Sequence, residues 1–111
     1  MRRDERLRKK RLRRERERAR RERQEALDRE RRLNELAGDP DGAWTRVESL
    51  VSTGKSREYG QAVALLRDLW ALADREGDLN AFGEGLALLR QRHRGKSSLL
   101  RRIDEAGLSS A

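Results

Sequence analysis

Thirteen Arg and Lys side chains lie within residues 2–21, and their chemistry is that of phosphate binding. Residues 1–23 hold 14 Arg and Lys against 5 Asp and Glu, a net charge of +9. A guanidinium donates paired hydrogen bonds to phosphate oxygens, and neutralising phosphates releases counterions from nucleic acid. This pattern predicts salt-dependent, sequence-independent contact with DNA or RNA. The residues expected to make it are Arg2, Arg3, Arg6, Arg8, Lys9, Lys10, Arg11, Arg13, Arg14, Arg16, Arg18, Arg20 and Arg21.

The acidic residues among these cations leave other interpretations open. Mixed runs of Arg and Glu are also typical of solvated helices that act as spacers or contact another protein. Arg outnumbers Lys 24 to 4 in the chain, which is typical of a GC-rich genome as well as of phosphate recognition. A membrane surface is not an expected partner, since Leu7 and Leu12 fall on different helical faces.

The rest of the chain offers no set of side chains suited to catalysis. It has no Cys and a single His, His93, so neither a thiolate nor a multi-histidine metal site is expected. Gly-Lys-Ser occurs at 54–56 and at 95–97, but a phosphate loop needs another Gly five residues before each Gly. Ser49 and Arg90 occupy those positions, inside expected helices. We therefore expect no enzyme, no metal, no cofactor and no small-molecule substrate.

The charge is divided between two unlike parts. Residues 1–37 carry a net charge of +8, whereas the remainder holds 11 basic and 11 acidic groups. Residues 2–37 contain no Gly or Pro and are mostly good helix formers, so we expect a helix over about 5–36. Leu12, Ala19, Ala26 and Leu33 recur every seven residues, but the second seam position is charged. This favours a solvated helix whose last turns rest on the second part, rather than a coiled coil.

The run from Gly38 to Gly42 predicts a linker at 38–42 between the basic helical arm, residues 1–37, and a helical module, residues 43–108. Gly38 suits the position after a helix, Asp39 an N-cap and Pro40 the first turn of the next helix. No apolar run approaches the roughly 20 residues that cross a bilayer, and the charged N-terminus lacks a secretory signal, so a cytoplasmic protein is expected.

Within the module, apolar residues at helical spacing predict four helices. Ser56, Asp78 and Ser97 are the expected N-caps, and Gly54, Gly77, Gly95 and Gly107 mark the breaks. The expected inward residues are Trp44, Val47, Leu50, Val51, Tyr59, Ala62, Val63, Leu66, Leu69, Trp70, Ala73, Leu79, Phe82, Leu86, Leu89, Leu99, Leu100, Ile103 and Leu108. The fold class is therefore all-α: a long basic N-terminal helix followed by a small four-helix module containing an αα-hairpin.

Residues 43–108 also resemble the C-terminal helical segment of actinobacterial SWIM zinc-finger proteins. The matching residues include the run Ala62–Leu69, Gly77, Phe82, His93, Lys96 and the run Leu99–Leu108. The resemblance implies a bacterial cytoplasmic protein with a nucleic-acid or protein interaction role. The zinc finger itself is missing, because the chain has no Cys to act as a ligand.

These patterns together predict a non-enzymatic accessory protein that contacts nucleic acid through its basic N-terminal helix. The alternative is a helical protein–protein interaction adaptor in which the arm is a solvated spacer. In that case a groove between the hairpin and the shorter helices would accept the partner.

Overall fold

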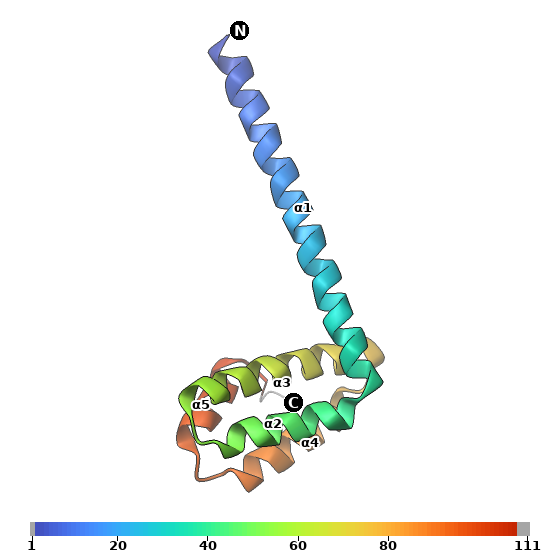
Figure 1. Ribbon diagram of the computed structural model, residues 1–111, viewed down its shortest axis with the longest axis vertical. Helices are drawn as coiled ribbons and strands as arrows, with labels where there is room; N and C mark the ends of the chain where they lie inside the picture. Colours follow the sequence, from blue (N-terminus) through green and yellow to red (C-terminus); the bar gives the residue numbers. More distant parts are fainter. Residues whose placement is uncertain (1, 109–111) are drawn as a thin grey trace. The chain divides into compact units, whose positions relative to one another are not determined.

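The computed structural model describes residues 2–108, and within them the chain forms five α-helices and no strand. The helices are α1 (Arg3–Gly38), α2 (Pro40–Ser52), α3 (Ser56–Glu76), α4 (Leu79–Arg92) and α5 (Ser97–Glu105) (Figure 1). The expected all-α class, with one long basic helix and four shorter ones, is confirmed. The chain divides into two compact units, Met1–Arg32 and Leu33–Ala111.

The first unit is a single stretch of helix α1. The carbonyl of Arg2 accepts from the backbone N–H groups of Glu5 and Arg6, at 3.2 and 3.3 Å, and so closes the first turn. Asp4 and Glu5 lie in that turn, where negative charge is favourable beside the unpaired N–H groups of the helix. Leu7, Leu12 and Leu27 are all exposed, so this unit has no core of its own.

The last turns of α1 belong to the second unit. Leu33 is buried and Leu36 packs against the module's core, while Asn34 accepts a hydrogen bond of 2.9 Å from Arg75 of α3. The boundary between the units therefore precedes Leu33, whereas the sequence places the end of the arm at Ala37. Leu33 and Leu36, two apolar residues near the end of an otherwise polar helix, thus join the last turns of α1 to the module.

The passage from α1 to α2 takes one residue. Asp39 is the N-cap of α2, its side chain accepts from the N–H of Gly42 at 3.0 Å, and Pro40 opens the helix, as expected. Residues 40–42, assigned to a linker from the sequence, form the first turn of α2. Gly38 lies within α1 and does not have a positive φ, because the turn is made by the Asp39 cap.

Helix α3 is the central element of the module, since α2, α4 and α5 all contact it. It is joined to α4 by Gly77 and Asp78 alone, which makes the expected αα-hairpin. Gly77 has φ 70°, a left-handed conformation that glycine adopts without strain, and the Asp78 N–H donates back to the Ala73 carbonyl at 2.8 Å.

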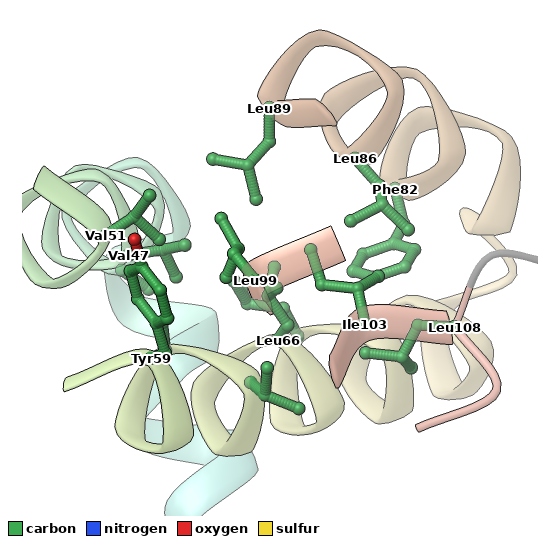
Figure 2. Close-up of a cluster of buried hydrophobic side chains, with 14 residues drawn as sticks. Val47, Val51, Tyr59, Leu66, Phe82, Leu86, Leu89, Leu99, Ile103 and Leu108 are labelled. Carbon is green, nitrogen blue, oxygen red and sulfur yellow. The ribbon is translucent and has the colours of Figure 1, made fainter. Parts of the chain in front are cut away.

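The apolar core gathers one face from each helix of the module. Leu66 of α3 lies near Leu99 and Ile103 of α5, and all three are fully buried (Figure 2). Val47 and Val51 of α2 pack near Tyr59, while Phe82, Leu86 and Leu89 close the core from α4. Truncating one of these fully buried Leu or Ile side chains to Ala costs about 2–5 kcal/mol.

Two N-caps and two core residues differ from the sequence expectation. Ser56 and Ser97 are the first helical residues, and the caps are Lys55 and Lys96. The Ser56 hydroxyl contacts the guanidinium of Arg102 in α5 rather than its own backbone. Trp70 is 38% exposed and Leu79 is 40% exposed instead of buried, and both border a groove beside α4.

Polar side chains tie the α4–α5 connection to α2. Glu48 accepts hydrogen bonds from Arg92 at 2.8 Å and from His93 at 2.7 Å. The Lys96 ammonium donates to the Val51 carbonyl at 3.0 Å, near the C-terminal end of α2 where carbonyls lack helical partners. His93 thus has a structural contact, in accordance with its position at a helix end.

Candidate nucleic-acid interface

Helix α1 presents the predicted phosphate-binding side chains to solvent. All thirteen residues of the set, from Arg2 to Arg21, are exposed. None of them lies within 4.0 Å of a carboxylate oxygen among the residues that the structure describes. Nearer the C-terminal end of α1, Arg31 forms an ion pair with Asp28 at 3.9 Å. The cations are therefore open to an external anion.

The helix sorts these cations onto faces. Because side chains three and four residues apart lie above one another on an α-helix, steps of four and three trace a single line along it. Such a line holds only Arg and Lys over seven consecutive positions, and we name it the basic stripe: Arg2, Arg6, Lys9, Arg13, Arg16, Arg20 and Arg23. At a rise of 1.5 Å per residue the stripe is about 30 Å long.

Neighbouring members of the stripe lie close in space. Lys9, Arg13 and Arg16 together line a shallow hollow whose floor includes Leu12. Glu5 and Glu17 lie at the edges of the stripe, and no carboxylate lies within it. The stripe is therefore a continuous row of positive charge with an average step of about 5 Å along the helix axis.

The opposite side of the helix has a different character. The same steps of four and three, started at Asp4, trace a line on which acidic and basic residues are mixed. We name this line the mixed face: Asp4, Arg8, Arg11, Glu15, Arg18 and Glu22. It holds three acids and three bases, so it is electrically neutral while the stripe carries seven positive charges.

The thirteen predicted residues are thus not equivalent. Six belong to the basic stripe, Arg8, Arg11 and Arg18 belong to the mixed face, and the remaining four, Arg3, Lys10, Arg14 and Arg21, lie along one side of the stripe. Sequence reasoning missed Arg23, which completes the stripe. The signal that finds it is the step of three residues from Arg20, rather than the local density of charge.

The module offers a second, chemically different surface. A groove of about 620 Å³ lies beside α4 and is bordered by Trp70 of α3 and by Leu108. Leu79 and Trp70 expose apolar surface in it, and Phe82 and Leu86 form part of its lining. Arg90, which also lines it, is paired with Asp104 of α5. The adaptor hypothesis places its groove between the hairpin and the shorter helices, whereas this groove is lined mainly by α4, with Trp70 of α3 and Leu108.

Comparison with known proteins adds no relative. No family model, no curated protein and no solved structure matches the chain. The resemblance of residues 43–108 to the helical segment of SWIM zinc-finger proteins stays a prediction. None of the helices formed by residues 2–108 has the length and apolar character needed to cross a membrane.

Proposed function

We propose that residues 2–23 bind the phosphate backbone of nucleic acid without sequence preference, in a non-enzymatic accessory role. The observation that carries the proposal is the exposure of all thirteen predicted cations, none of which is paired with a carboxylate among the described residues. A long side chain that already has an internal partner would have to give it up before it met a phosphate. Here that cost is absent.

The chemistry of the arm favours contact with backbone over contact with bases. Residues 2–38 contain no aromatic side chain on which a base could stack. Residues 2–23 also contain no Asn or Gln. Reading of bases relies on these amides as well as on Arg. Electrostatic attraction and counterion release therefore supply the affinity.

The test is a salt titration of the full chain against random-sequence duplex DNA and duplex RNA. The logarithm of the binding constant is expected to fall linearly with the logarithm of salt concentration, with a slope of about −0.9 per phosphate neutralised. Replacing Arg11, Arg13 and Arg14 by Glu should abolish binding. The matched control replaces Arg57, Arg67 and Arg101, three exposed residues of the module, by Glu and should retain it.

A protein-binding role of the module is a second candidate, and the exposed Trp70 favours it. A large aromatic side chain beside a groove is typical of the anchor points of protein interfaces. An interaction that depends on the groove would be lost in Trp70→Ser and kept in the variant with Glu at 11, 13 and 14. Binding lost in the arm variant and kept in Trp70→Ser would reject this candidate.

A further inference from the structure

We infer that the arm grips duplex nucleic acid with one face only, the basic stripe, and leaves the mixed face in solvent. The inference rests on the proposed function and specifies the ligand and the contacting residues. It separates seven side chains that meet phosphates from three, Arg8, Arg11 and Arg18, that the density of charge alone would include.

The first argument is the division of charge around the helix. The stripe carries seven positive charges and the mixed face carries none in sum. On the mixed face Arg11 has Glu15 four residues away, and Arg18 lies between Glu15 and Glu22, at three and four residues. A phosphate approaching that face would meet carboxylates at the same distance as guanidinium groups. The stripe itself contains no carboxylate, and Glu5 and Glu17 lie only at its edges.

The second argument concerns the kind of nucleic acid. A duplex carries one negative charge per roughly 1.7 Å of its axis, about twice the charge density of one of its strands, so each neutralised phosphate releases more counterion. A single strand compensates for its lower density by stacking bases on aromatic side chains, and residues 2–38 have none. An arm that relies on charge alone therefore prefers the duplex.

The third argument is one of fit. An α-helix with its side chains is about 10–12 Å across, and the row of cations on the stripe steps by about 5 Å over roughly 30 Å. The phosphates of each strand of a duplex recur every 3.4 Å along its axis. Arg and Lys side chains are long enough to reach neighbouring phosphates from such a row. When the arm lies along the outside of the duplex, one side of the helix is within reach of the phosphates.

The experiment compares two full-length variants that lose the same charge from opposite faces. The stripe variant carries Arg13→Gln, Arg16→Gln and Arg20→Gln, and the mixed-face variant carries Arg8→Gln, Arg11→Gln and Arg18→Gln. Gln keeps a good helix former at each position, and circular dichroism verifies that both variants are as helical as the parent chain. Binding to a random duplex of about 20 base pairs, and to one of its separated strands, is measured over a range of salt.

The stripe variant is expected to lose about 3 from the magnitude of the salt slope and on the order of 100-fold in affinity at 0.1 M salt. In the mixed-face variant the magnitude of the salt slope should fall by less than about 1, and the affinity at 0.1 M salt by less than about 5-fold. Equal losses in the two variants would overturn the one-face inference while the proposed function stood. Tighter binding of the parent chain to the single strand would overturn the choice of duplex. A parent chain that binds neither at any salt would reject the proposed function itself.

Discussion

The imidazole of His93 donates from Nε2 to Oε2 of Glu48 across 2.7 Å, joining the end of α4 to the middle of α2. An ionised carboxylate only accepts, so the proton of this hydrogen bond belongs to the His93 ring. Only 11% of the His93 side chain is exposed, and Arg92 donates to the other oxygen of Glu48 at 2.8 Å. The pair thus fixes the α4–α5 connection against α2.

We expect Glu48→Gln to weaken the fold at neutral pH and to matter less in acid. Burial raises the pKa of Glu48, but hydrogen bonds from His93 and Arg92, and attraction to both, outweigh burial and hold it below 4.5. A carboxylate with a lowered pKa in the folded state stabilises the fold above its unfolded pKa, and that stability is lost as pH falls through the folded value. The free energy of unfolding in urea should drop by about 1 kcal/mol at pH 7 and by less at pH 3.

Glu105, an exposed residue of α5, supplies the control for this comparison. Glu105→Gln should change the free energy of unfolding at pH 7 by less than about 0.5 kcal/mol. A Glu48→Gln deficit that stayed the same size at both pH values would show that the ionisation of Glu48 contributes nothing to stability.

A matched pair of glycines in α4 tests the packing of Trp44. A Cβ on Gly85 would lie 3.0 Å from the Trp44 ring, which is itself packed against Phe82 with the ring centroids 5.7 Å apart. A Cβ on Gly83 would meet nothing within 4 Å. Gly83→Ala should therefore raise the free energy of unfolding by about 0.5–1 kcal/mol through helix propensity alone. The free energy of unfolding of Gly85→Ala should be lower than that of Gly83→Ala by about 1 kcal/mol or more, because the indole ring of Trp44 must shift.

Thermal and urea unfolding of the two glycine variants, followed by far-UV circular dichroism, provide the measurement. The near-UV signal of Trp44 should change in Gly85→Ala and stay as in the parent chain in Gly83→Ala. Equal stabilisation by both substitutions would mean that the Trp44 ring is free to move away from α4.

A matched pair of leucines in α1 tests where the folded body begins. Leu33 is 7% exposed and Leu27 is 57% exposed, although both lie in the same helix and are followed by polar residues. Leu33→Ala should cost about 2–3 kcal/mol of unfolding free energy, whereas Leu27→Ala should cost less than about 0.5 kcal/mol. The measurement is urea unfolding, with the Trp44 and Trp70 fluorescence as the signal. Equal costs would place the start of the module elsewhere.

The contrast between these leucines also shows which features of the fold can be predicted from the sequence and which cannot. Apolar spacing and the Asp39, Pro40 and Gly77 signals predict the helices, since local chemistry alone determines them. Periodicity does not separate Leu69 from Trp70, because adjacent positions on α3 both fit an inward stripe. The choice between them depends on how the other helices pack against α3, which the spacing within α3 does not contain.

The candidate interface shows the same division. Composition predicts which segment carries the positive charge, but the thirteen predicted residues are chosen without regard to their positions around the helix axis. Counting charge along the chain leaves out Arg23, which lies on the stripe, and does not distinguish Arg8, Arg11 and Arg18, which lie on the mixed face. Whether these residues contact phosphate stays a prediction. The expected helix over about 5–36 already contains these faces, and they are found by following steps of three and four residues along it.

Two carboxylates of α1 provide the last test, because they differ in face and in nothing else of note. Glu17 lies at the edge of the basic stripe, four residues from Arg13 and three from Arg20, whereas Glu22 lies on the mixed face. Both are exposed, and both become neutral on substitution by Gln. Each substitution removes one negative charge and so raises the net charge of the chain by one. Net charge alone therefore predicts the same gain in affinity for both variants.

If the stripe alone meets the duplex, Glu17→Gln should tighten binding at 0.1 M salt by about threefold, because it removes a repulsive charge within a few ångströms of the phosphates. Glu22→Gln should change affinity by less than about 1.5-fold, since salt screens a charge that lies across the helix, about 10 Å away. Fluorescence anisotropy with a labelled duplex measures both. An equal gain from the two substitutions would mean that the arm acts as a diffuse cloud of charge, and the stripe would have no separate role in binding.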